Sequence, residues 1–459
     1  MSATGAPGVR MKTRKPTAAN DASLLFLIFI SPIAASPLMQ MRFIEAPGAK
    51  LVNLVALAFV ISFLYGRSKL LRTADRIERN ALIVFAALMC VFVVAFLRSL
   101  PNVGTFHEMA QDAFPASPVE YALSRLGVPL VFAAMFVFIL KYMCTPAAMS
   151  RLLETIGVAM FVLSAVIIGA VLVEPAALFD PSRVAIARLM TNVVGMHYND
   201  VGTFYSIAAP ILLYLALKRG AFRTLNYFVA LVAVTVLESR TALLVFVAMS
   251  VATLFVLGRA RTLLAALPPV ALIAAIALGP VLINLLSVGE SAHSAISLDK
   301  LLAGREERIW IPLALEWWSD PGRFWFGAGE YGILSSYMLH VGVTLAVGVA
   351  HNAYFEYFLD NGFILTSFLL IGIAAFLHWS IRVGLTIRSQ LYWVLLLSVA
   401  AFLIASFTGR RFYPENENVF LMPVMAMLIN MARLKLPEGS GTTAARKVAP
   451  AKQAVGANY

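Results

Sequence analysis

Runs of apolar residues, each about 20 residues long, alternate with shorter polar connections along most of the chain. A helix of that length crosses the hydrocarbon core of a bilayer, so the pattern predicts transmembrane helices. A longer and more polar stretch, residues 287–351, separates the ninth run from the tenth. We therefore expect an all-α polytopic membrane protein with about twelve transmembrane helices, at residues 23–39, 49–66, 80–98, 122–143, 152–173, 198–217, 223–238, 240–257, 263–286, 352–378, 390–408 and 416–433.

The composition supports this class. Hydrophobic residues make up 60% of the 459 residues and charged residues only 13%, which is more apolar surface than a water-soluble fold can bury. The formal charge is +12, but the basic residues mostly flank apolar runs and form no patch interleaved with aromatic residues. A nucleic-acid partner is therefore not expected.

Lysine and arginine residues concentrate in alternate connections. With the N-terminus placed in the cytoplasm, 23 of the 36 basic residues lie inside and 19 of the 24 acidic residues lie outside. Cytoplasmic connections of membrane proteins carry such an excess of positive charge. The distribution predicts that both termini are cytoplasmic and that residues 287–351 form a loop on the outer face.

The chain divides accordingly into a disordered cytoplasmic tail at 1–20, helices 1–9 at 21–286, the outer loop at 287–351, helices 10–12 at 352–434 and a second disordered tail at 435–459. The first apolar run also has the basic start and short apolar stretch of a cleaved signal peptide. A kinked first helix is favoured instead, because further spans follow and the run contains Pro32 and Pro37.

The outer loop contains the pattern of a short amphipathic helix, because Ile309, Leu313 and Trp317 fall four residues apart on one stripe. Arg305 and Arg308, three residues apart, would share a face of its first turn, where free N–H groups favour an anion such as phosphate. The alternative is a solvated face on which these arginines pair with the glutamates between them. The tryptophans of the loop could stack on sugars, but anchoring in the membrane interface is the favoured interpretation.

Arg240 lies in a tight turn, residues 238–241, on the predicted outer face. An external arginine departs from the positive-inside bias, so an anionic ligand outside is a candidate partner. An arginine that extends to the lipid headgroups is an equally good interpretation. Arg188, Arg410 and Arg411 also lie outside, as lesser candidates for an acceptor or donor site that are more typical of surface positions.

His351 and Asn352 stand where the outer loop re-enters the membrane. An unperturbed imidazole titrates near pH 6.5, which suits a general base acting on a sugar hydroxyl, although a histidine at an interface is more often structural. Asn352 could contribute to the same site or only cap the tenth helix. Glu356 and Asp360, one turn apart, could orient a partner or lie on the helix surface.

Several kinds of chemistry lack their sequence pattern. The chain has no P-loop, no GxGxxG after a strand, no GxSxG and no HExxH. Its two cysteines, Cys90 and Cys144, show no zinc-binding spacing, and the outer acidic residues form no compact metal-ligand cluster. We therefore expect neither a metal nor a cofactor, and chemistry carried by arginines and a histidine.

Four short motifs in sequence resemble those of the O-antigen ligase and polymerase superfamily. They are Ser239-Arg240-Thr241, Gly304-Arg305 through Trp310, Phe326-Gly327-Ala328-Gly329, and His351-Asn352 through Gly362. The resemblance covers roughly residues 190–380, and the number of helices agrees along the remainder.

The resemblance implies a GT-C-like membrane glycosyltransferase of the bacterial inner membrane, with its active site in the periplasm. Such an enzyme moves a glycan from undecaprenyl pyrophosphate to an acceptor, either a glycan or lipid A-core, without a metal. Carried over by motif, His351 would be the base for the acceptor hydroxyl, Arg240 and Arg305 would hold the pyrophosphate, and Arg308 would assist. The segment 410–418 has no counterpart in the family pattern and is a candidate for shaping the acceptor site.

Other functions remain open at the level of sequence. A transporter or flippase of lipid-linked sugars should place ionisable residues in mid-membrane, and the apolar runs hold almost none. A purely structural membrane protein would not need the outer arginines. The sequence does not separate a polymerase from a ligase, and it leaves sugar identity and oligomeric state undetermined.

Overall fold

The computed structural model describes residues 18–34, 36–41, 50–65, 75–109, 117–179, 184–259, 309–336, 350–409, 412–413 and 419–435. Helices make up the regular structure over these residues, which contain no β-strand. The expected all-α class is therefore confirmed. The predicted ninth helix, 263–286, and most of the outer loop lie outside the described residues.

Eleven of the expected apolar runs coincide with helices in the described part of the chain. They are α1 (Ala18–Ile30) with α2 (Pro37–Gln40), α3 (Leu51–Tyr65), α4 (Arg76–Ser99), α6 (Pro118–Tyr142), α7 (Pro146–Val173), α9 (Tyr198–Arg219), α10 (Ala221–Val236), α11 (Arg240–Val256), α17 (Ala353–Ile387), α18 (Gln390–Ala405) and α19 (Leu421–Lys435). The break after α1 falls at Pro32 and Pro37, as expected for a kinked first segment.

Shorter helices lie between them. The expected amphipathic helix is α14 (Ile311–Ser319), which buries Leu313 and Trp317, and α15 (Pro321–Phe326) follows it. The apolar runs did not predict two short α-helices, α5 (Val103–Met109) and α8 (Val184–Val193). They also did not predict the 3₁₀ turns η2 (Leu100–Asn102), η3 (Pro175–Phe179) and η6 (Gly332–Ser335).

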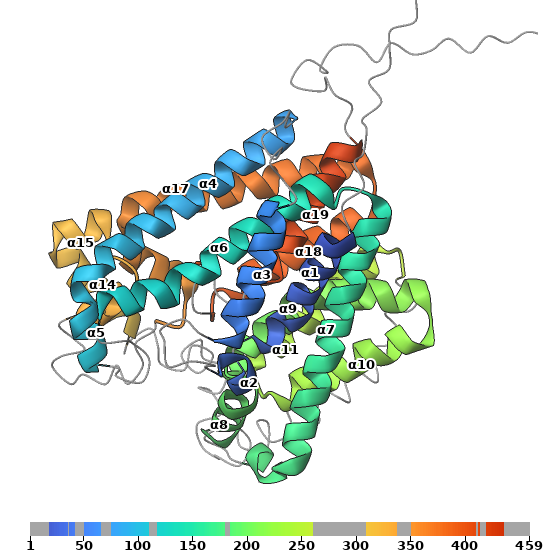
Figure 1. Cartoon of the computed structure of the whole chain (residues 1–459), viewed down its shortest axis with the longest axis horizontal. Helices are drawn as coiled ribbons and strands as arrows, with labels where there is room; N and C mark the ends of the chain where they lie inside the picture. The colour runs from blue at the N-terminus through green and yellow to red at the C-terminus, as the bar shows by residue number, and fades with distance from the viewer. Residues whose placement is uncertain are drawn as a thin grey trace, which may run out of the picture.

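The helices fit a multi-pass membrane protein. By length and composition, five of those described could cross a membrane, namely α4 with its continuation to Glu108, α6, α7, α9 and α17. α4 and α17 lie side by side in Figure 1 and contact each other, and both leave most of their apolar surface exposed. The predicted total of twelve spans stays a prediction.

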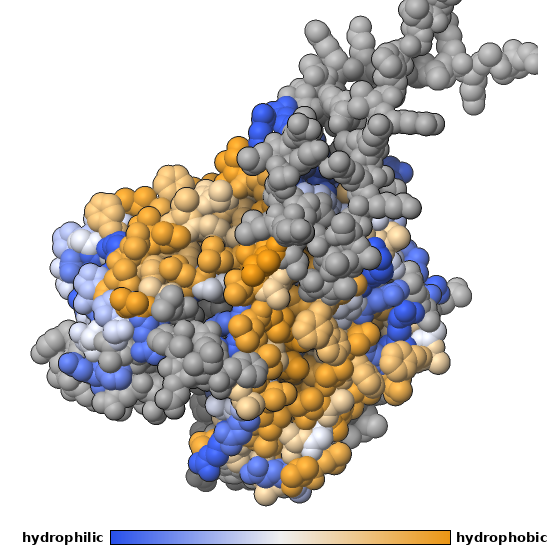
Figure 2. Space-filling model, viewed as in Figure 1, coloured by the Kyte–Doolittle hydropathy of each residue, from blue (hydrophilic) through white to orange (hydrophobic). Residues whose placement is uncertain are grey.

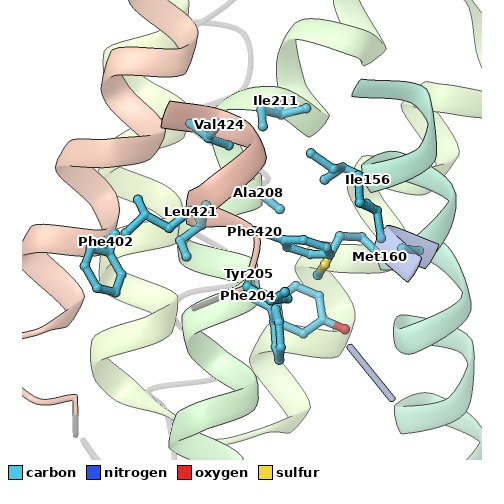
Figure 3. Packing of buried hydrophobic residues seen from close by; sticks show 14 of the residues in the cluster. Ile156, Met160, Phe204, Tyr205, Ala208, Ile211, Phe402, Phe420, Leu421 and Val424 are labelled. Atoms are coloured by element: carbon cyan, nitrogen blue, oxygen red, sulfur yellow. The ribbon is translucent and has the colours of Figure 1, made fainter. Parts of the chain in front are cut away.

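Two hydrophobic cores organise the described part of the fold. The larger core centres on α9, which packs against α7, α10, α11 and α18 and is buried along most of its length. Figure 3 shows Phe204 and Tyr205 of α9 facing Met160 of α7 and Phe420 before α19. The smaller core joins one end of α4, α5 and α6 to α14 and to the first turns of α17. This second core carries the candidate site.

A cluster of charged residues ties three helices together at the opposite end of the bundle. Arg433 of α19 pairs with Asp75 (Nε to Oδ2, 2.6 Å) and Glu78 (Nη2 to Oε2, 2.6 Å) at the start of α4. Lys141 of α6 lies 3.1 Å from the other Glu78 oxygen. Arg433 also donates to the Leu140 carbonyl. All of these residues come from segments that the charge pattern assigns to one side of the membrane.

Replacing Arg433 with methionine should destabilise the fold by about 3 kcal/mol, because it leaves two largely buried carboxylates without their main partner. Thermal or denaturant unfolding of the purified protein in detergent measures the effect. Arg382→Met, which removes an exposed arginine from α17, is the matched control and should change stability little. Equal effects of the two variants would contradict the structural role of the cluster.

Candidate functional site

His351 has a backbone conformation that is uncommon for residues other than glycine. Its φ is 55°, in the left-handed region, which costs about 1–2 kcal/mol for an L-residue. The side chain is half-buried at the start of α17. Such strain persists only where the surrounding structure holds the residue in place, and it is common at functional sites.

The peptide groups on either side of His351 are held by hydrogen bonds. The Ala350 N–H donates to Glu356 Oε1 (2.6 Å), and the Ala350 carbonyl accepts from Trp310 Nε1 (2.8 Å). After the histidine, the Ala353 N–H donates to the Ser406 carbonyl (2.9 Å) at the end of α18. Glu356 is almost fully buried. These contacts fix the direction in which the His351 side chain leaves the backbone.

Asn352 caps α17. Its Oδ1 accepts from the backbone N–H groups of Tyr354 (3.0 Å) and Phe355 (3.1 Å), which satisfies two of the donors that a helix start leaves unpaired. The Tyr354 hydroxyl donates to the Leu403 carbonyl (2.8 Å) of α18. The capping role weighed for Asn352 is thus confirmed.

The Phe326-Gly327-Ala328-Gly329 motif forms a turn that docks on the first turns of α17. Ala328 N–H donates to the Leu359 carbonyl (2.9 Å) and Gly329 N–H to the Asp360 carbonyl (2.9 Å). The Asp360 carboxylate also accepts from the Gly332 N–H (2.9 Å). The motif therefore positions the helix that begins beside His351.

Two glycines allow this docking. Gly362 interrupts the helical dihedrals of α17 with φ 74° and ψ −178°, a conformation open almost only to glycine. A Cβ on Gly362 would lie 2.4 Å from the Phe326 nitrogen, and one on Gly327 would lie 2.3 Å from the Asp360 carbonyl oxygen. The expected tenth helix is consequently two helical segments that meet at Gly362.

Buried polar groups fill the space beneath the turn. The Tyr121 hydroxyl of α6 donates to Glu330 Oε2 (3.0 Å), and the Glu330 N–H donates to the Ala95 carbonyl of α4 (2.9 Å). Tyr413, which lies between α18 and α19, accepts from Asn361 Nδ2. Burial, with the nearby charge of Asp360, holds the pKa of Tyr413 well above its usual value, so its phenol stays neutral.

Arg240 is the first residue of α11 and is exposed. Its neighbour Ser239 donates from Oγ to Asn199 Oδ1 (2.8 Å) at the start of α9. α11 packs along α18, whose last turn is bonded to the start of α17. α18 therefore contacts both the helix that begins at Arg240 and the helix that begins after His351.

Only one of the other expected site residues lies in the part of the chain that the structure describes. Arg188 is exposed on α8, in the 184–193 segment. Arg305, Arg308, Arg410 and Arg411 lie outside the described residues. Over the described ranges, no three His, Cys, Asp or Glu side chains gather in a group that could hold a metal.

Sequence reasoning missed residues that matter at this end of the fold. Arg98, in the last turn of α4, donates to the carbonyls of Phe326 and Gly327, and Glu330 is nearly fully buried. The signal for Arg98 was present, since it is an arginine on the predicted outer side, as Arg240 is. Glu330 carried no comparable signal, because its burial depends on how α4 and α6 meet the turn.

The fold and this end of the bundle define a multi-pass helical membrane protein with a polar centre at one end of its helices. A family model described as O-antigen ligase matches residues 225–370. The match confirms the resemblance of the four motifs and supports assignment of the chain to the O-antigen ligase and polymerase superfamily. Arg240, Arg305, Arg308 and His351 fall inside the matched range, whereas Arg188, Arg410 and Arg411 fall outside it. No curated protein matches the chain.

Gly362→Ala should destabilise the protein by at least about 2 kcal/mol, since alanine disfavours this conformation and its Cβ would collide with the Phe326 backbone. Unfolding in detergent measures the change. Gly372→Ala is the control on the same helix, because nothing lies within 4 Å of a Cβ there, and it should be neutral or stabilising. A tolerated Gly362→Ala would show that the turn does not need this close approach.

Proposed function

We propose that the protein is a glycosyltransferase that moves a glycan from undecaprenyl pyrophosphate to an acceptor sugar at the periplasmic face of the bacterial inner membrane. The family assignment indicates an O-antigen ligase or polymerase type of membrane glycosyltransferase. The observation that carries the finer proposal is the strained His351, held on both sides by backbone hydrogen bonds within the range matched by the family.

In this reaction the imidazole of His351 takes the proton from the acceptor hydroxyl. The oxygen then attacks the anomeric carbon of the donor sugar, and the bond from that carbon to the pyrophosphate oxygen breaks. The bonding electron pair leaves with the pyrophosphate. A single displacement of this kind inverts the configuration at the anomeric carbon.

Negative charge grows on the pyrophosphate as it departs, and Arg240, Arg305 and Arg308 are proposed to stabilise that charge. Fixed cations in a partly dry cleft act most strongly where charge develops in the transition state. Binding donor and acceptor side by side also removes part of the entropic barrier. Because arginines supply the positive charge, we propose that the transfer is metal-independent.

His351→Ala should lower the rate of transfer by about 10²–10⁴-fold through loss of the general base. The assay uses purified protein, undecaprenyl-pyrophosphate glycan and acceptor, with and without EDTA. Retained activity in the variant, or strict dependence on a divalent ion, would contradict the proposal. In cells that carry the His351→Ala variant, accumulation of lipid-linked single units outside would indicate a polymerase. Accumulation of unattached full-length glycan would indicate a ligase, and single units trapped inside would indicate a transporter.

Trp310→Phe should lower kcat by about tenfold with little change in KM, because it keeps an aromatic ring at this position but removes the indole N–H that holds the carbonyl before His351. Steady-state kinetics on the same substrates separate the two constants. Trp318→Phe is the control, since Trp318, near the other end of α14, is 71% exposed. If both variants were equally active, the Trp310 bond would have no part in positioning the base.

A further inference from the structure

A cavity of about 800 Å³ opens between the outer end of α4, helix α15 and the kink in α17. One wall is formed by Val94 and Arg98 of α4 and by Asn102 of η2, the 3₁₀ turn that follows it. Ile364 and Leu365, just beyond the Gly362 kink, form the facing wall, and Trp325 of α15 lies over it. We call this cavity the α4–α17 groove.

The polar end of the groove carries a fixed positive charge. Arg98 donates to the carbonyls of Phe326 and Gly327, which uses two of the five N–H groups of a guanidinium. Among the described residues, no carboxylate pairs with Arg98. Arg323, also in the lining, is by contrast paired with Glu316 (2.9 Å) and Asp320 (3.4 Å). The groove therefore offers one uncompensated guanidinium at a set position.

The other end of the groove is apolar and open. Val94 is 49% exposed and Trp325 45% exposed. Figure 2 shows a broad hydrophobic surface over the region where α4 and α17 lie in Figure 1. Both helices are among those long and apolar enough to cross a membrane. Exposed Trp318, Trp325 and Phe326 gather on α14 and α15, and such aromatic residues are typical of the membrane interface.

We propose that the α4–α17 groove binds one anionic phospholipid of the bilayer. Its phosphate lies at Arg98 and one acyl chain follows Val94 and Ile364. A phosphodiester carries a single negative charge, which matches the single uncompensated arginine, and its chain meets apolar walls that open toward lipid. Basic pockets between transmembrane helices bind lipid headgroups by this combination.

This site is separate from the centre at His351. Asn361, at the wall of the groove, follows His351 by ten positions along α17, which corresponds to about 15 Å at the rise of an α-helix. A phosphate at Arg98 is therefore out of reach of the imidazole. The bound lipid instead bridges α4 and α17 beneath the turn that docks on α17. The inference does not depend on the proposed transfer reaction.

Native mass spectrometry of the full-length protein in detergent tests the site, with dioleoyl phosphatidylglycerol, dioleoylglycerol and undecaprenyl phosphate as probes. We expect one saturable phosphatidylglycerol per chain and at least about tenfold weaker binding of dioleoylglycerol, which lacks the charged phosphate. Ile364→Trp, which fills the groove and leaves the arginine intact, should weaken phosphatidylglycerol binding by about the same factor.

Arg98→Gln should also weaken binding, and the unfolding temperature of each variant shows whether the fold is retained. Ile371→Trp is the matched control, because Ile371 is an exposed apolar residue of α17 outside the groove, and it should bind as the wild type does. Equal binding of the two tryptophan variants, equal binding of dioleoylglycerol, or tighter binding of undecaprenyl phosphate in the groove would overturn the assignment. The assay involves no turnover, so these outcomes leave the proposed reaction untouched.

Discussion

The structure around the candidate site depends on the hydrogen bonds that Asp360 accepts from the turn at residues 327–332. Asp360 accepts one backbone N–H through its carbonyl and another through its carboxylate, so a single buried residue fixes both the position and the rotation of the first segment of α17. The turn and α17 come so close to each other that no side chain larger than the hydrogen of glycine fits at Gly327 or Gly362. Without this contact, the turn and the start of α17 would no longer be held in a fixed position relative to each other.

Contacts between segments also explain how a strained residue can persist at the start of α17. The left-handed conformation of His351 is unfavourable in isolation, but the peptide groups around it bond to Glu356, Trp310 and Ser406, which come from different parts of the fold. The cost of the conformation is therefore offset by contacts that exist only when α14, α17 and α18 are assembled. A pre-positioned side chain suits the role of general base that we propose for His351.

The sequence predicted the helices well where length and hydropathy decide the outcome. Apolar runs of membrane-spanning length became α4, α7 and α9, because a backbone in lipid must satisfy its hydrogen bonds internally. The short helices α5 and α8 lack that constraint and were missed. The kink at Gly362 was missed as well, because glycine within an apolar run does not show whether another backbone approaches it.

For the candidate site, sequence reasoning singled out His351 and Arg240 through their positions next to membrane-spanning runs and through the family resemblance, and their roles stay predictions. It could not find the strain at His351, the burial of Glu330 or the two carbonyl bonds of Arg98. Each of these arises from contacts between segments more than 200 residues apart or from local dihedrals. Spacing along the chain carries no record of such contacts.

The charged cluster at the opposite end of the bundle has a consequence for biogenesis. Asp75, Glu78 and Lys141 enter the membrane region with the early part of the chain, whereas Arg433 arrives with its last described helix. Until α19 inserts, the carboxylates of α4 lack the guanidinium that binds both of them. Completion of this cluster is thus coupled to the insertion of α19, and a chain that has not yet inserted this helix leaves the two carboxylates without that partner.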